Sequence, residues 1–172
     1  MSASVQSMNC DGKPMAVKAD SNATIRYYAQ LCPPFVHEPT RDRLRVIGTG
    51  DGKGEGLQAL VDFGKDDVVF TFTGSVVTEQ SLYTLQIAPG QFVADPIVMG
   101  KVLHSCDPNM HCDMSTLTFT ARRDIRAGDM LTMDYETTED KLYRAFHCGC
   151  GAAICRGDIL GKLARGKLAY KR

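Results

Sequence analysis

The sequence predicts a mostly β (α+β) domain, and two observations carry that prediction. Between positions 43 and 135, runs of β-branched and aromatic residues recur about every ten residues, with turn residues between them. Over the same span no long apolar repeat of helical period appears. Short strands joined by turns at this spacing are typical of a compact β domain.

The first predicted strands follow one another from residue 43. RLRVIG at 43–48 predicts a strand, and the glycine-rich stretch GTGDGKGEG at 48–56 comes directly after it. LQALVDF at 57–63 and a GKDD turn at 64–67 follow. VVFTFTGSVV at 68–77 is rich in β-branched and aromatic residues and predicts further strand.

Two strand pairs are predicted after residue 80, and one short helix is predicted near each end of the chain. SLYTLQIAPGQFVADP at 81–96 predicts a hairpin that turns at Pro89-Gly90. STLTFTARRDIRAGDMLTMDY at 115–135 predicts another strand pair, which turns at RAGD. We expect short helices at 23–31 and at 138–146.

The chain divides into four expected segments. Residues 1–42 carry no pattern that indicates a function, and residues 43–140 form the β domain. Residues 141–160 are a short segment rich in cysteine and glycine. Residues 161–172 form a basic tail, which contains no acidic residue; such a tail is usually a solvated end and less often a docking site.

Composition excludes several classes of protein. The chain has 172 residues, enough for one domain with a buried core, and 20 basic against 20 acidic residues give no net charge. We therefore expect neither a membrane partner nor direct readout of nucleic acid. No apolar run approaches the roughly 20 residues that span a bilayer, and the first residues lack a hydrophobic signal core, so we expect an intracellular protein. Nothing in the sequence separates nucleus from cytoplasm.

The glycine-rich stretch fits neither of two phosphate-binding patterns. The dinucleotide pattern G-x-G-x-x-G, started at Gly48 or Gly50, would need its third glycine at Lys53 or Glu55. The P-loop pattern would need a glycine at Ile47. What remains is a loop whose backbone can approach another group closely, or a plain hairpin turn.

The cysteine-rich segment HCGCGAAICRG, at 147–157, indicates a metal site. Seven cysteines are an odd number, which argues against a framework of disulfides alone. Cys148, Cys150 and Cys155 give the spacing C-x-C-x4-C, whereas structural zinc requires four ligands. Three unrelated buried thiols are the alternative. Candidates for the fourth ligand are Cys106, Cys112, Cys10, Cys32 and His147.

Two further stretches are unusually rich in polar side chains. LHSCDPN at 103–109 combines a histidine, a thiol, a carboxylate, a proline and an asparagine, more than a turn requires. MLTMDYE at 130–136 ends a predicted strand with a phenol between two carboxylates. Each stretch is either part of a site or a dense structural turn.

Taken in order, these stretches resemble the SET-domain family of S-adenosylmethionine-dependent lysine methyltransferases. RVIGTGDGKGEGLQA resembles the family's opening strand and G-x-G loop, and FTFTGSVVTE resembles its YTGEVV-like strand. LHSCDPN matches the Asn-His-Ser-Cys-x-Pro-Asn motif in six of seven positions, and MLTMDY is similar to ELTFDY. The run from Cys148 to Gly157 matches the post-SET pattern C-x-C-x4-C-x-G.

The resemblance implies a SET-domain fold of small sheets, with a C-terminal knotted crossing and a zinc-bound post-SET segment. It implies S-adenosyl-L-methionine as cofactor and a structural Zn²⁺ whose fourth ligand is Cys106, ahead of Cys112. Pro108 and Asn109 would fix the crossing. The implied metal ligands are Cys106, Cys148, Cys150 and Cys155, and the implied cofactor-binding residues are Gly52, Lys53, Gly54, Glu55, Gly56, Leu103, His104 and Phe146.

The resemblance also implies the reacting side of the site. Tyr135 would place its hydroxyl near the methyl group and the incoming nitrogen, and Tyr83 would line the acceptor channel. Met133 stands where many family members carry the Phe or Tyr that limits the number of methyl groups added, so it would set product degree. Met133 and Tyr135 are two apart on one predicted strand, and their side chains would share a face.

The sequence departs from the family in two places that affect function. Leu103 replaces the motif's Asn, which helps to anchor the methionine end of the cofactor. The stretch between Thr78 and Leu103, which forms much of the peptide groove in the family, is short. The chain is expected to be a protein-lysine N-methyltransferase that acts on a histone or another protein. The alternatives are a SET-fold enzyme that acts on a small molecule or one dedicated partner, and a non-catalytic SET-fold binding module.

Overall fold

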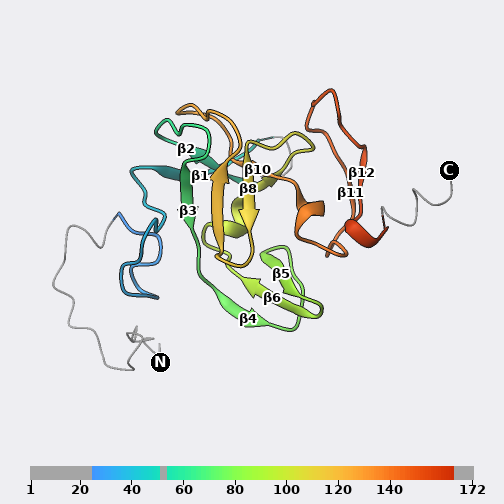
Figure 1. Cartoon of the computed structure of the whole chain (residues 1–172), viewed down its shortest axis with the longest axis horizontal. Coiled ribbons are helices and arrows are strands. Elements are labelled where there is room, and N and C mark those ends of the chain that lie inside the picture. Colours follow the sequence, from blue (N-terminus) through green and yellow to red (C-terminus); the bar gives the residue numbers. More distant parts are fainter. Residues whose placement is uncertain (1–24, 51–53, 165–172) are drawn as a thin grey trace, which may run out of the picture.

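Several small sheets make up the domain, as Figure 1 shows for residues 25–50 and 54–164, the part of the chain that the computed structural model describes. The mostly β fold is confirmed. The strands are β1 (Leu44–Gly48), β2 (Glu55–Ala59), β3 (Val68–Thr71), β4 (Ser75–Val77), β5 (Thr84–Ala88), β6 (Gln91–Ala94), β7 (Leu103–His104), β8 (Met110–Asp113), β9 (Thr118–Ala121), β10 (Thr132–Met133), β11 (Phe146–His147) and β12 (Asp158–Ile159). Two 3₁₀ turns, η1 (Met99–Lys101) and η2 (Tyr135–Thr137), lie among them.

The main core lies on the sheet of order β3-β9-β8. Met110 and Cys112 of β8 are buried while the residues after each of them are exposed, which is the alternation of a strand with one face in the core. Phe119 of β9 stacks on Phe70 of β3, with ring centroids 4.7 Å apart. Phe72 contacts the same ring at 5.6 Å. These aromatic contacts between strands hold the sheet to the core.

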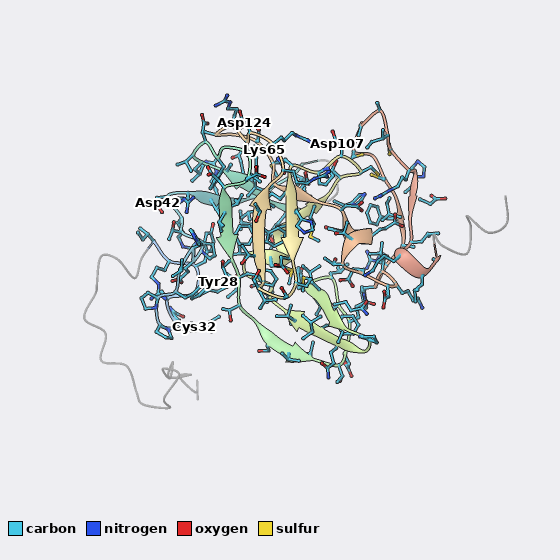
Figure 2. All side chains as sticks on the ribbon, in the orientation of Figure 1. Tyr28, Cys32, Asp42, Lys65, Asp107 and Asp124 are labelled. Atoms are coloured by element: carbon cyan, nitrogen blue, oxygen red, sulfur yellow. The ribbon has the colours of Figure 1, made fainter. Side chains whose placement is uncertain are left out.

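The segment before β1 packs on this core. Tyr28 is fully buried, and its hydroxyl donates to a carboxylate oxygen of Asp95. Figure 2 labels Tyr28 beside the lower half of β3. Asp95 also accepts from the backbone N–H groups of residues 97, 98 and 99, so it fixes the turn that enters η1. Residues near position 28 are thereby attached to the chain 67 positions later.

The hairpin predicted at 81–96 is confirmed as β5 and β6. The two strands pair antiparallel, and the chain turns at Pro89-Gly90, where Gly90 has a φ of 72° that favours glycine. β4 adds to the far edge of β6, giving the order β4-β6-β5. In Figure 1 this three-stranded sheet, the insert sheet below, projects beneath β3 and β8.

A parallel pair, β7 with β10, marks the crossing of two segments distant in sequence. Leu103 lies opposite Thr132, and His104 lies opposite Met133. Asn109 fastens the same crossing: its amide oxygen accepts from the Thr132 N–H at 2.9 Å, and its amide nitrogen donates to the Met130 carbonyl at 2.9 Å. The amide of Asn109 therefore replaces backbone pairing at this point.

The strand pair predicted around RAGD is wrong. The chain does turn at 126–129, but β10 does not pair with β9. After the turn, Leu131 donates its N–H to the carbonyl of Leu57, and residue 59 exchanges hydrogen bonds with residues 128 and 129. The returning chain thus forms its hydrogen bonds with β2. It cannot pair with β9, because β3 and β8 already occupy the two edges of that strand.

Neither predicted helix forms in the residues that the structure describes. Residues 138–146 run as bends and extended chain after η2. The carbonyls of Glu139 and Asp140, which a helix would use internally, instead accept from the N–H groups of Lys162 and Leu163. Of the stretch 23–31, residues 25–31 form turns, and Arg26 makes an isolated bridge with Thr40. Long-range pairing overrides local helix propensity in both places.

Among the described residues, no helix is long and apolar enough to cross a membrane.

Candidate active site

A cavity of about 560 Å³ lies between the insert sheet, the β7–β10 crossing and the segment from residue 142 to 150. This volume is in the range of sites that hold small molecules and cofactors. Its walls are mostly apolar, with a few polar groups. The residues that line it include Gln80, Leu82, Leu85, Val102, Leu103, His104, Met133, Tyr135, Glu139, Leu142, Tyr143, Arg144 and Phe146.

Tyr135 is held at the cavity by its hydroxyl group. The hydroxyl donates to the backbone carbonyl of Val102 at 2.8 Å, which fixes the ring relative to β7. Burial raises the pKa of Tyr135 to about 12. The side chain is therefore a neutral phenol at physiological pH, able to donate or accept a hydrogen bond but not to act as a base.

His104 connects Tyr135 to the cysteine cluster. Its Nδ1 accepts from the backbone N–H of Tyr135 at 3.2 Å, so the ring proton lies on Nε2. Nε2 is 3.5 Å from Sγ of Cys106. The rings of His104, Tyr135 and Phe146 form an aromatic wall, with His104 and Phe146 centroids 5.6 Å apart and nearly perpendicular.

Met133 and Leu103 complete the wall beside Tyr135. Met133 is buried at 2% exposure, and it lines the same cavity as Tyr135, as the spacing of two along the chain predicts. Leu103 pairs across from Thr132 and also lines the cavity. A side chain on Gly56 would collide with the side chains of Leu103 and Met130, so Gly56 allows these two to pack against β2.

Four cysteines converge at the base of the segment that carries Phe146. The Sγ atoms of Cys106, Cys148, Cys150 and Cys155 all lie within 4.8 Å of one another, and Cys106 and Cys148 are 3.9 Å apart. Tetrahedral zinc with Zn–S bonds of about 2.3 Å requires sulfur atoms roughly 3.8 Å apart. The backbone N–H of Arg156 donates to Sγ of Cys106 at 3.3 Å, as expected for a thiolate. The four residues present therefore fit a structural zinc ion.

The other candidates for the fourth ligand lie elsewhere. Cys112 is buried in the main core with its thiol 3.4 Å from the sulfur of Met114, and burial raises its pKa to about 12. It is not part of the four-cysteine cluster. His147 is exposed and pairs with Asp158 at 3.0 Å. Cys32 is not part of the cluster, and Cys10 lies outside the described residues.

Arg156 links the cysteine cluster to the strand end that bears Tyr135. Its guanidinium forms a two-point contact with the carboxylate of Asp134, one hydrogen bond of which is 2.7 Å long. Burial alone would raise the pKa of Asp134, but hydrogen bonds from Arg156 and from the Glu136 N–H outweigh it and lower the pKa. The carboxylate of Glu136 accepts from the N–H groups of Leu160 and Gly161.

A second polar connection ties the cavity to the insert sheet, and no pattern in the sequence indicates it. Glu139 accepts from the N–H of Gln86 and from the amide of Gln80, both at 2.7 Å. Gln86 also exchanges hydrogen bonds with Asp140. Arg156 was likewise not among the predicted site residues, although its position directly after Cys155 could have indicated it.

The structure does not bring every predicted residue to this cavity. Gly54, Glu55 and Gly56 are not among its lining residues, and Glu55 instead pairs with Lys101 at 2.6 Å. Tyr83 does not line it either; its ring packs on Gly100 and lies 4.8 Å from the ammonium of Lys101. Gly52 and Lys53 lie outside the described residues.

Comparison with known proteins relates this geometry to one family. The family model described as SET domain matches residues 54–136. Methyltransferase flvH of Aspergillus flavus is 27% identical, over 77% of this chain and 76% of that protein. Histone-lysine N-methyltransferase SUV39H2 of Homo sapiens is 26% identical, over 74% of this chain and 42% of that protein. The chain thus spans about two fifths of the SUV39H2 relative.

Solved structures share the fold. The methyltransferase domain of human SETMAR has a TM-score of 0.53 and 22% identity, over 69% of this chain and 58% of that chain. SUVH6 of Arabidopsis thaliana, solved in complex with SAM, has a TM-score of 0.55 and 20% identity, over 67% of this chain and 32% of that chain. At these identities the likeness establishes the arrangement of the strands and nothing about ligands.

Proposed function

The chain belongs to the SET-domain family, and from that premise we propose that it is an S-adenosylmethionine-dependent protein-lysine N-methyltransferase. The observation that carries the proposal is the cavity whose wall combines Tyr135 and Met133 with the aromatic rings of His104 and Phe146. A phenol, an apolar channel wall and an aromatic surface are the groups that methyl transfer from a purine-containing sulfonium to an amine requires.

Each of these side chains has a role that its surroundings support. The aromatic wall of His104 and Phe146 suits the adenine of the cofactor, which when bound supplies an electrophilic methyl group. Tyr135 is neutral and fixed by Val102, so its oxygen holds the acceptor nitrogen in line without removing its proton. Met133 fills the space beside it and limits how many methyl groups the nitrogen can carry.

The cysteine cluster has a structural role in this proposal. Cys106, Cys148, Cys150 and Cys155 would hold zinc with all four positions occupied by sulfur, which leaves no open position for catalysis. The ion would fasten the segment of Phe146 to LHSCDPN, since Cys106 belongs to that stretch. Loss of the metal would therefore loosen one wall of the cavity.

The acceptor in this proposal is a lysine of an intracellular protein. Relatives named histone-lysine N-methyltransferases support histones as the first proteins to test. The test incubates the full chain with methyl-labelled S-adenosylmethionine, core histones and whole-cell extract, with Tyr135→Phe as the matched control. Label on a lysine in a protein band, absent or strongly reduced with Tyr135→Phe, supports the proposal. Absence of label in every protein fraction overturns it.

A second candidate is a SET-fold enzyme that acts on a small molecule or on one dedicated partner. The relative that matches over comparable lengths of both chains, flvH, is named a methyltransferase without a histone substrate. Leu103 in place of the motif's Asn also favours an altered site. The same incubation separates the two functions, because label in a filtrate compound that chromatography resolves from S-adenosylmethionine, and that is absent without the protein, indicates a small acceptor.

A further inference from the structure

Glu139 is a buried carboxylate on the wall of the cavity. It is 3% exposed, and among the described residues that line the cavity it is the one acidic side chain. The backbone N–H of Glu139 donates to the carbonyl of Tyr135 at 3.0 Å, so Glu139 lies one turn of chain after Tyr135. Position and chemistry both set it apart from the apolar residues around it.

The carboxylate of Glu139 has no ion-pair partner within 4.0 Å in the part of the chain that the structure describes, and the more distant ammonium of Lys162 makes the smallest of the contributions that lower its pKa. Its two oxygens accept from Gln80 and Gln86, which are neutral donors. The nearest acidic neighbour, Asp140, takes the ammonium of Lys162 at 3.6 Å, and no ammonium or guanidinium lies within 4.0 Å of Glu139. Burial raises the pKa of Glu139, which expresses the cost of an unneutralised charge.

A buried charge is retained at such a cost when something neutralises it in the working state. Glu139 is held by two hydrogen bonds of 2.7 Å and by a further hydrogen bond from the Thr138 side chain, and a carboxylate with about four acceptor sites can take one more donor. A cationic group that enters the cavity could form an ion pair with the carboxylate of Glu139. Although Arg144 also lines the cavity, the surroundings of Glu139 therefore favour a positively charged group over a neutral one.

Glu139 is attached to a different part of the fold from the aromatic wall. Glu139 is fastened to Gln80 and Gln86 of the insert sheet, whereas the aromatic wall of His104 and Phe146 adjoins the cysteine cluster. Figure 1 shows the insert sheet and the β11–β12 segment as separate projections of the fold. A group bound to Glu139 would therefore contact the insert-sheet side of the cavity.

We propose that Glu139 is a specificity-determining residue that binds the alkylammonium end of the acceptor as it enters the cavity. This inference rests on the proposed function, since it assigns the acceptor side of the same site. It excludes acceptors without a cationic group at the position of the amine. The bound ammonium gives its proton to solvent water before methyl transfer, because a protonated amine has no free electron pair with which to attack a methyl group.

The test uses the full chain and two small probes of similar size, butylammonium chloride and 1-butanol. Their dissociation constants are measured by NMR titration at neutral pH in the presence of S-adenosylhomocysteine. Wild type should bind butylammonium about tenfold more tightly than 1-butanol, the scale of one charge-assisted hydrogen bond. Glu139→Gln should remove this preference, and Glu139→Asp, which keeps the charge, should retain part of it.

Asp140→Asn is the matched control, because Asp140 also bonds to Gln86 but is absent from the lining of the cavity. It should leave the preference unchanged. If wild type shows no preference, or if Asp140→Asn abolishes it as Glu139→Gln does, the inference is wrong; the first result needs no variant that folds. Should Glu139→Gln weaken S-adenosylmethionine relative to S-adenosylhomocysteine, Glu139 faces the cofactor and the inference is again wrong.

Failure of the proposed function gives a different pattern. A preference for butylammonium that depends on Glu139, without methyl transfer to any protein, would retain the cation site and overturn the lysine methyltransferase. Methyl transfer that continues at the wild-type rate and KM with Glu139→Gln would retain the enzyme and overturn the role of Glu139.

Discussion

The guanidinium of Arg156 donates two hydrogen bonds to the carboxylate of Asp134. Arg156 follows the metal-ligand candidate Cys155, and Asp134 precedes the phenol Tyr135, so this pair joins the cysteine cluster to the candidate catalytic residue. The backbone N–H of Arg156 also donates to Sγ of Cys106. The geometry of the reacting side chain and the order of the cysteine-rich segment are consequently coupled.

Each chain should bind one zinc ion through Cys106, Cys148, Cys150 and Cys155. Cys148→Ser removes a buried ligand and should abolish zinc binding under reducing conditions, as measured by elemental analysis of the purified protein. Cys112→Ser is the control and should keep the metal, since its thiol lies in the main core. Wild type without zinc would refute the site, and loss of zinc with Cys112→Ser would reassign the fourth ligand.

Asp134→Asn should lower the free energy of unfolding by about 1–3 kcal/mol, because it removes a charged partner from the partly buried guanidinium of Arg156. The loss should depend on pH. Since the folded-state pKa of Asp134 lies below its ordinary value, its contribution is complete above that value and disappears as pH falls through the folded-state pKa. Urea unfolding of wild type and variant should therefore converge at low pH.

Asp107→Asn provides the comparison for this pair. Asp107 pairs with Arg123 at 3.1 Å, but both side chains are about half exposed. We expect a change within about 0.5 kcal/mol. Equal effects of the two substitutions would mean that the contact with Arg156 is no stronger than a surface ion pair.

Tyr135→Phe should slow methyl transfer roughly 10–1000-fold while the fold and cofactor binding persist, because only the hydroxyl that bonds Val102 is removed. Rates come from single-turnover assays, and binding from calorimetry. The wild-type rate should show no titration of this phenol below about pH 10, since burial raises its pKa to about 12. Undiminished turnover in Tyr135→Phe would exclude the phenol from the mechanism.

Met133→Tyr should restrict the enzyme to fewer methyl additions. Met133 is buried and lines the cavity with Tyr135, so a larger side chain with a hydroxyl occupies the space that a methylated amine needs. Mass spectrometry of the products from wild type and variant gives the distribution directly. An identical distribution would show that another residue sets product degree.

Leu103→Asn should tighten S-adenosylmethionine binding by something under about tenfold, because the amide restores a hydrogen bond that leucine cannot make. Calorimetry on both proteins measures the change. Leu103 also packs against Gly56, so part of the gain is offset by lost apolar contact. Unchanged or weaker binding would indicate a site rebuilt around Leu103 and would favour the small-molecule function.

Local patterns predicted the parts of the site whose residues are close in the chain. The spacing of Cys148, Cys150 and Cys155 indicated three ligands, and the pair Met133 and Tyr135 was expected on one face. The same reasoning failed for residues 138–146. There, hydrogen bonds from Lys162 and Leu163 take the carbonyls on which a helix depends, and no pattern within the segment reveals that competition.

By itself the sequence determined the short strands, the hairpin at Pro89-Gly90 and the cysteine spacing, because side-chain periodicity, turn residues and ligand spacing act over fewer than about ten residues. Only the tertiary structure decided that β10 pairs with β7, that Cys106 joins three cysteines more than 40 positions later, and that Glu139 is buried on the wall of the cavity. Those features depend on which of several groups, distant in the sequence, forms each hydrogen bond and occupies each buried position. That competition is settled only when the whole chain packs.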